Sequence, residues 1–219
     1  MIKRTIKFGD YDTAAHGWTL TGWQLSPAEQ KTTSIETVGG DGSWDLSTAM
    51  TDGIPRYKDR TLTVTLELSE GDRLSRERVV KEFINTLHGR RVDIHLPDDP
   101  YDHLNGGLSV RREYNDLAHA AVTITAVCDP WKYLNHEVTA TVSATSAGTE
   151  AEILNEGLRV LVPVLTVTGS VTIIFGTASK AFSAGTHQWG DLLLAPGINE
   201  LTVKGSGSVT FKYREAVLE

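Results

Sequence analysis

The chain has 219 residues and a mass of 23.9 kDa, enough for one or two domains that bury about 70% of the unfolded surface. Hydrophobic residues make up 40% of it and charged residues 22%, and no apolar run approaches the roughly 18 residues of a membrane span, which argues against wholesale disorder and against membrane insertion. A formal net charge of -7 and a pI near 5.5 argue against specific nucleic-acid binding, which normally needs a basic face to displace phosphate counterions.

The N-terminal residues 1–8 lack the apolar segment of a secretory signal, so we expect the protein to be made in the cytosol. The density of charge then falls near Trp131. Residues 1–133 hold 36 of the 49 charged residues, whereas residues 134–219 hold 13. A shift of this size predicts two domains, 1–133 and 134–219, joined through residues 129–134.

The first domain is predicted to be mostly strand. Apolar residues alternate without a break from Leu62 to Leu68, which places every second side chain on one face. Weaker strand patterns, separated by Gly, Asp, Asn or Pro, cover residues 18–25, 34–38, 91–96, 108–114 and 120–128. The single cysteine, Cys128, lies in the last of these runs, where burial as a small hydrophobe is expected rather than reactivity.

A helix is predicted to interrupt these strands within residues 74–89. Asp72 or Ser75 can cap its start, and Gly89 can adopt the left-handed conformation after its last turn. We expect it to pack one apolar stripe against the sheet and to leave three charged residues, Arg76, Lys81 and Glu82, in water. The stripe recurs at helical spacing through Val79, Val80, Phe83, Ile84 and Leu87.

The second domain shows no helical pattern, and its short strands with frequent turn signals predict a sandwich or jelly roll. The expected strands are 137–144, 160–168, 171–175, 192–194, 199–203 and 208–213. The expected turns are Gly169-Ser170, Gly176, Pro196-Gly197 and Gly205-Ser206-Gly207. The last of these lacks the third glycine and following helix of a dinucleotide site, so it is interpreted as a hairpin turn.

Motifs for chemistry are largely missing, because the sequence contains no phosphate loop, no nucleophile elbow and no His-Glu-x-x-His helix. The carboxylates of Asp98, Asp99 and Asp102 could bind Ca²⁺ or share a proton, but the prolines around them favour a loop. Trp189 could stack on a sugar, although a place at the edge of a sandwich core is favoured. The histidines show no metal-ligand spacing and lie at 16, 88, 95, 103, 119, 136 and 187. We therefore assign no catalytic, cofactor-binding or metal-binding residue.

Several segments nevertheless point to one family by their order. A Gly-Asp-Gly segment is followed by a Tyr-x-Asp-Arg strand entry, a helix ending in Leu-His-Gly, a Pro-Asp-Asp loop and a Gly-x-Leu-x-Val strand. In this order they resemble the distal tail proteins of long-tailed, siphovirus-like bacteriophages. The matching segments are 39–47, 53–62, 86–90, 96–101, 107–110, 128–131, 155–157, 163–169 and 194–203.

The resemblance implies a mostly β protein, with an N-terminal ring-forming (belt) domain that carries one helix and a C-terminal galectin-like or jelly-roll sandwich. It also implies a non-enzymatic virion component that needs no cofactor. Such proteins form hexameric rings at the tail tip and join the tail tube protein and the tape-measure protein to the tail hub and its receptor-binding proteins. The expected contacts between subunits are the hairpin at Asp41-Gly42 and the loop with Arg56, Tyr57, Asp59 and Arg60.

Two other functions remain open from the residues alone. One is a soluble carbohydrate-binding module that uses the second domain and Trp189. The other is a hydrolase built on Asp98, Asp99 and Asp102. Basic residues gather around the predicted helix, so in a ring this helix should face a neighbouring subunit or the outside rather than the channel. They are Arg73, Arg76, Arg78, Lys81, Arg90 and Arg91.

Overall fold

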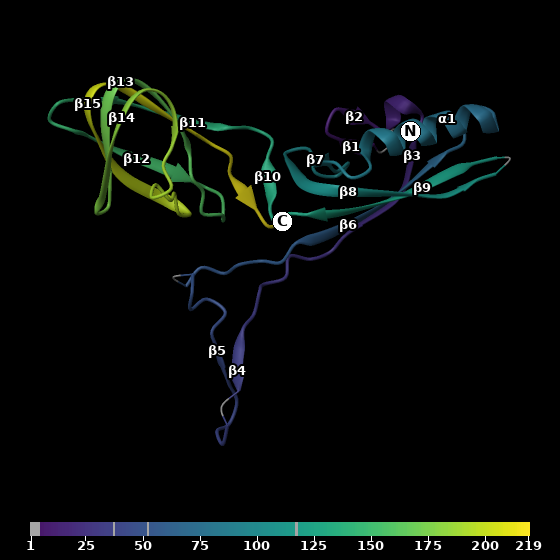
Figure 1. Ribbon diagram of the computed structural model, residues 1–219, viewed down its shortest axis with the longest axis horizontal. Helices are drawn as coiled ribbons and strands as arrows, with labels where there is room; N and C mark the ends of the chain where they lie inside the picture. The colour runs from purple at the N-terminus through teal and green to yellow at the C-terminus, as the bar shows by residue number, and fades with distance from the viewer. Residues whose placement is uncertain (1–4, 37, 52, 117) are drawn as a thin grey trace. The chain divides into compact units, whose positions relative to one another are not determined.

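The computed structural model describes residues 5–219 except 37, 52 and 117, and it divides into two compact units (Figure 1). Unit 1 is Met1–Lys132 and unit 2 is Tyr133–Glu219. Antiparallel strands dominate both units, so the mostly β fold class predicted from the sequence is confirmed. No helix in the described ranges is long and apolar enough to cross a lipid bilayer.

Unit 1 is built on an antiparallel sheet with the strand order β2-β1-β7-β8-β9-β6-β3. The alternation predicted for residues 62–68 is confirmed, because Leu62, Val64, Leu66 and Leu68 are all buried on one face of β6. The strands are β1 (Lys7–Phe8), β2 (Tyr11–Asp12), β3 (Thr19–Leu25), β6 (Arg60–Leu68), β7 (Arg91–His95), β8 (Asp102–Asn115) and β9 (Ala120–Cys128). A single turn of 3₁₀ helix, η1 (Ala14–His16), follows β2.

The predicted helix is α1 (Arg73–Leu87), and it lies along the sheet of unit 1 in Figure 1. Asp72 caps its start, since Asp72 Oδ1 accepts a hydrogen bond of 2.7 Å from Ser75 N. Gly89 adopts a φ of 77° after its end, as expected. The ring of Phe83 contacts Trp18 at 5.0 Å and Tyr11 at 5.2 Å between centroids, which joins the helix to the core of the sheet.

The prediction for Arg76 is wrong, because this side chain is only 2% exposed. Arg76 precedes the buried Val80 by four residues and therefore lies on the buried side of α1. Its guanidinium donates from Nη1 to Gly71 O at 2.6 Å and from Nη2 to Asp116 O at 3.0 Å. The cation thus joins the start of α1 to the loop between β8 and β9. The apolar stripe could not indicate this role, because it contains no information about buried charged residues.

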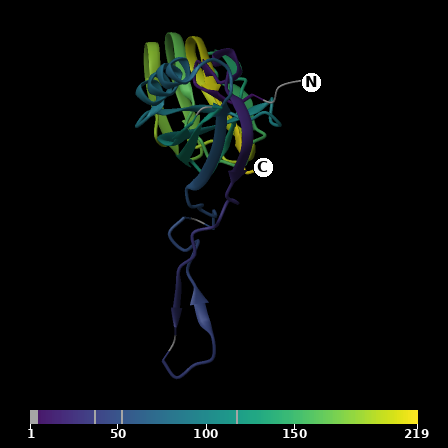
Figure 2. The ribbon, with the colours of Figure 1, turned by 90° about the vertical axis from the view of Figure 1, so that its right-hand side faces the viewer.

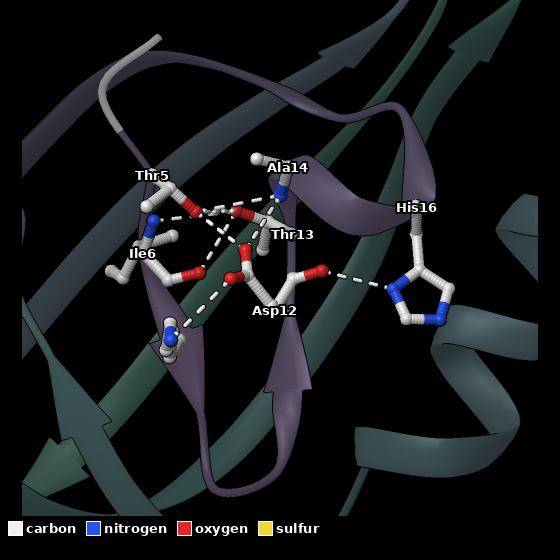
Figure 3. A network of polar contacts seen from close by, with 7 residues as sticks. Thr5, Ile6, Asp12, Thr13, Ala14 and His16 are labelled. Carbon is white, nitrogen blue, oxygen red and sulfur yellow. Dashed lines mark hydrogen bonds and ion pairs between the residues drawn. The ribbon is translucent and has the colours of Figure 1, made fainter. Parts of the chain in front are cut away.

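The β1–β2 hairpin is held by the polar network drawn in Figure 3. Asp12 Oδ1 accepts hydrogen bonds from Thr5 Oγ1 at 2.8 Å and from Ala14 N at 3.0 Å. Thr13 is 1% exposed, and its hydroxyl donates to Ile6 O at 2.8 Å. These bonds satisfy backbone groups beside a hairpin that has only two residues in each strand. Side-chain hydrogen bonds thus take the place of the backbone hydrogen bonds that a longer strand pair would supply.

Unit 2 is a sandwich in which one long strand serves both layers. The first half of β15 (Gly197–Tyr213) pairs with β12 (Thr149–Asn155), and its second half pairs with β11 (Val138–Ala144). On its other side β15 pairs with β13 (Val164–Phe175), which in turn pairs with β14 (Ala178–Gln188). Two short strands complete the chain, β10 (Lys132–Leu134) at the start of the unit and its partner β16 (Ala216–Val217).

The interpretation of Gly205-Ser206-Gly207 and of Gly169-Ser170 as turns is wrong. Both segments lie inside continuous strands, because β13 and β15 run side by side as antiparallel partners and Gly169 lies opposite Gly207. A Cβ on Gly207 would lie 1.8 Å from Thr168 O, and a Cβ on Gly169 would lie 2.3 Å from Ser206 O. Glycine is therefore needed for backbone approach rather than for chain reversal.

Two strands of unit 2 have no counterpart among the predicted ones, namely β12 and β14. Along β14 the described side chains alternate poorly, and Phe182 is the buried residue of the strand. Such a polar edge strand lacks the apolar alternation that distinguishes a strand from a loop in the sequence. The predicted strands 160–168 and 171–175 fall largely on a single strand, β13, which begins at Val164 and continues through Gly169.

Candidate assembly surface

The largest feature of unit 1 outside its core is an arm, which we define as residues 26–59 between β3 and β6. Its two chain segments are joined by backbone hydrogen bonds from Ser26 N to Thr61 O, from Lys58 N to Glu29 O and from Lys31 N to Arg56 O, at 2.9, 2.8 and 2.7 Å. These bonds continue the β3–β6 ladder outward. The base of the arm is thus a pair of hydrogen-bonded antiparallel segments and not an irregular loop.

The tip of the arm is a two-stranded hairpin of β4 (Ser34–Glu36) and β5 (Ser43–Asp45), which lie side by side in Figure 2. The turn predicted at Asp41-Gly42 lies between these strands, and Gly42 has a φ of 79° that favours glycine. Ser47 closes the open end of the hairpin, because its Oγ accepts a hydrogen bond of 2.9 Å from Thr33 N, and Asp45 Oδ1 accepts one of 2.8 Å from Ser47 N.

Large apolar side chains at this tip face solvent. Ile35 and Trp44 are direct cross-strand partners, and they are 54% and 70% exposed. Val38 is also exposed almost completely, as is Met50, which lies outside the hairpin in the part of the arm after β5. An isolated two-stranded hairpin is at best marginally stable in water, and a cluster of exposed apolar residues usually marks an interaction surface. The hairpin therefore has the properties of a docking element.

The remaining predicted contact residues lie at the base of the arm and differ in their exposure to solvent. Arg60 is 2% exposed and donates from Nε to Ser26 O at 2.8 Å, so it anchors the arm to the sheet and does not present itself to a neighbour. Tyr57 packs edge to face on Trp131 at 5.4 Å between ring centroids. Arg56 and Asp59 are exposed. The expectation of an exposed contact is thus wrong for Arg60.

The acidic cluster does not form a metal site. Asp99 makes an ion pair of 2.7 Å with Lys132, and both side chains are largely buried. Asp98 lies in the loop before β8, whereas Asp102 begins that strand. Across the described part of the chain, no group of three or more His, Cys, Asp or Glu side chains could hold a metal ion.

Two of the scattered histidines prove to be neighbours. His95 from β7 and His103 from β8 lie 5.3 Å apart between ring centroids, and His103 Nε2 is 3.7 Å from Asp93 Oδ1. His88 caps the end of α1 instead, and its Nδ1 accepts a hydrogen bond of 3.0 Å from Val110 N. Strand pairing brought His95 and His103 together, and their spacing in sequence could not indicate it.

Cys128 and Trp189 are both buried. Burial raises the pKa of the Cys128 thiol to about 11, which leaves it protonated and unreactive at neutral pH. Trp189 is 4% exposed, packs on Phe182 and donates from Nε1 to Asp191 Oδ2 at 2.9 Å. Its ring face is therefore not available for stacking on a sugar, and the carbohydrate site based on it is wrong.

The likeness of this chain to known proteins lies in its fold. No family model and no curated protein matches this sequence. Among solved structures, the chain is similar to SPP1 Dit (gp 19.1), described as a paradigm of the hub adsorption apparatus in phages that infect Gram-positive bacteria. The match has a TM-score of 0.68 at 17% identity and covers 96% of this chain and 98% of that one.

The chain shares the fold of this phage hub protein. Because the match covers nearly the whole of both chains, it includes the sheet of unit 1 and the sandwich of unit 2. The resemblance to distal tail proteins that the order of short motifs indicated is thus confirmed at the level of the fold.

Proposed function

We propose that this chain is a structural, non-enzymatic subunit of a bacteriophage tail tip. In this proposal it forms a hexameric ring that joins the tail tube and the end of the tape-measure protein to the tail hub and the adsorption apparatus. The observation that carries the proposal is the fold shared with SPP1 Dit over 96% of the chain, since that protein belongs to a hub adsorption apparatus.

The arm is our candidate for the contact between subunits. A closed ring uses a head-to-tail interface in which one surface of a subunit binds a different surface of the next. An extended hairpin with Ile35 and Trp44 exposed suits one side of such an interface, because its apolar side chains lack a second layer within the subunit. Burial of such side chains against a neighbour contributes about 25 cal/mol per Å² of apolar surface.

The test is the mass of the full chain in solution, followed by negative-stain images. We expect hexamers and ring-shaped particles at high protein concentration. Substitution of both hairpin residues, Ile35→Ser with Trp44→Ser, should give monomers with an unchanged circular dichroism spectrum. The matched control is Leu193→Ser, which removes an aliphatic residue of unit 2 that is 49% exposed and should leave the ring intact.

A wild-type chain that remains monomeric at every concentration, alone and with its neighbouring tail proteins, would contradict the ring. Rings that survive the double substitution would contradict only the role of the arm and would leave the ring itself supported. Two fragments separate these outcomes further: residues 1–133 should self-associate and residues 134–219 should be monomeric.

If phage DNA passes through the channel of the ring, the ring should have little affinity for duplex DNA. Six copies at -7 each carry a formal charge of -42, which opposes the phosphate contacts that give DNA affinity. A gel-shift assay at physiological salt should show no binding of duplex DNA to the assembled protein. Submicromolar binding would contradict the assignment of a channel to this ring.

A further inference from the structure

The outer face of the β12–β15 ladder in unit 2 combines apolar and acidic residues in a fixed order. Leu154 of β12 lies opposite Ile198 of β15, and Glu152 lies opposite Glu200. One row further on, Glu150 lies opposite Thr202. Directly opposed residues point to the same side of a sheet, with rows about 7 Å apart, so these six side chains form one continuous surface.

The apolar end of this surface is rigidly built and yet exposed. Leu154 and Ile198 are 46% and 64% exposed, whereas the next residues along the two strands, Asn155 and Asn199, are buried. Asn155 Nδ2 donates to Leu194 O at 3.1 Å, and Asn199 Nδ2 donates to Ile153 O at 3.2 Å. Two buried amides therefore fix the backbone on which the exposed pair stands.

The acidic end has an unfavourable arrangement within the subunit. Like charges directly opposite each other destabilise a strand pair, and Glu152 faces Glu200. Over the residues that the structure describes, no ion pair within 4 Å involves Glu150, Glu152 or Glu200. The three glutamates line a hollow of about 720 Å³ together with Ile174 and Thr202.

We propose that this face docks a protein partner whose surface carries an apolar side chain flanked by lysines or arginines. The apolar residue of the partner would cover Leu154 and Ile198, and its cations would enter the hollow between the glutamates. Complementary charge of this kind steers encounter and selects the partner, while burial of the aliphatic pair holds it.

Other occupants fit this face less well. A second copy of unit 2 would bring its own three glutamates against these three, and unit 2 carries eight acidic residues against five lysines and arginines. A polysaccharide would need aromatic rings for stacking, but the large exposed hydrophobic residues of unit 2 are aliphatic: Leu154, Leu158, Val162, Leu193 and Ile198. The proposal concerns unit 2 alone and does not depend on the ring.

The probe for the test is a capped hexapeptide in which lysine and valine alternate, and its control replaces each lysine by glutamate. Methyl NMR of the full chain, labelled at isoleucine, reports on both units at low ionic strength, where the Debye length is about 30 Å. We expect the basic peptide to shift Ile198 and Ile174 and to leave Ile35 of the arm unchanged. The acidic peptide should shift none of them.

Variants identify the groups that bind. Glu152→Gln and Glu200→Gln should each weaken the affinity about two- to fivefold, as expected for solvent-exposed charges, and Leu154→Ser should also weaken it. The matched control is Glu137→Gln, a carboxylate that precedes β11 and should leave the affinity unchanged.

Three results of the peptide experiments would overturn the proposal: no shift at Ile198 with the basic peptide, an equal response to the acidic peptide, or an affinity unaffected by the two glutamine substitutions. Concentration-dependent shifts of Ile198 in the chain alone would also overturn it, in favour of a second copy as the occupant. A failure of the ring, in contrast, appears in the mass measurement and leaves these shifts intact.

Discussion

Unit 1 and unit 2 each bury one face of their antiparallel strands, but they cover that face by different means. In unit 1 a separate element, α1, lies on the sheet and inserts Val80, Phe83 and Leu87. In unit 2 no helix of the described residues covers the strands, whose own buried side chains form the core, and β13 and β15 approach each other closely at Gly169 and Gly207. The stability of unit 1 should therefore depend on side chains at a helix–sheet contact, and that of unit 2 on a few glycine positions where paired strands approach each other closely.

The substitution Gly207→Ala should have the largest effect and should act on unit 2. The new Cβ would lie 1.8 Å from Thr168 O, and the φ of 124° is itself strained for alanine. We expect a loss of at least about 4 kcal/mol, the range of exceptional single substitutions. Hydrogen exchange should show unit 2 unprotected and unit 1 unchanged.

The matched control for this substitution is Gly176→Ala, where φ is 57° but no atom lies within 4 Å of the added Cβ. It should cost about 1 kcal/mol from the backbone conformation alone. Equal effects of the two alanines would show that the pairing of β13 with β15 does not depend on close approach at Gly207.

The substitution Phe83→Ala should act on unit 1 and come second. It removes the ring that joins α1 to Trp18 and Tyr11, and the truncation of a buried phenylalanine destabilises by about 3–5 kcal/mol. Thermal unfolding followed by hydrogen exchange should show the loss in unit 1 only. Leu74→Ala, at a helix residue that is 77% exposed, should stay within about 0.5 kcal/mol of the wild type.

The substitution Arg76→Ala should cost about 2–3 kcal/mol. It leaves the carbonyls of Gly71 and Asp116 without the guanidinium that bonds both, in a place shielded from water. Arg76→Lys should not restore the stability, because an ammonium group lacks the fork that reaches two carbonyls at once. Full rescue by lysine would show that only the charge matters. Denaturant unfolding of both variants measures the difference.

Low pH should destabilise unit 1 more than unit 2, and the effect of each carboxyl group should be the smallest of those predicted here. The described carboxyl groups with a lowered pKa all belong to unit 1: Asp12, Asp45, Asp72, Glu113 and Asp116. At Asp72 the hydrogen bond from Ser75 N is the main cause, and at Asp116 that from His119 N. At Asp12 burial raises the pKa, but the hydrogen bonds from Thr5 and Ala14 and the charge of Lys7 outweigh it.

A lowered pKa in the folded state stabilises the fold fully above the unfolded value, which is 3.8 for aspartate. That stabilisation is lost as the pH falls through the folded pKa. Unit 1 should therefore lose stability below about pH 4 while unit 2 changes less. Thermal unfolding at neutral pH and at about pH 3, resolved by unit through hydrogen exchange, measures this. A larger loss in unit 2 would contradict it.

The expectations that the structure confirms are those carried by local pattern. Strict alternation from Leu62 to Leu68 specified a half-buried strand, and the helical spacing of Val80, Phe83 and Leu87 specified the buried stripe of α1. Asp72 and Gly89 marked the ends of that helix. Each of these signals depends on neighbours within a few residues, and so the sequence alone contained them.

The tertiary structure decided the features that depend on distant residues. Gly207 has the local signature of a turn, and only pairing with the strand that contains Thr168, 39 residues earlier in the chain, makes it a position of close approach inside a continuous strand. The sequence around Arg76 indicates a solvent-exposed charge, but in the fold its guanidinium donates to the carbonyl of Asp116. Likewise, only the register of β12 on β15 places Glu152 opposite Glu200. Local pattern determined which segments became strands and helix, because propensity and periodicity act over short range. Only the packed fold determined which of their polar groups meet, because strand pairing joins residues with no fixed spacing along the chain.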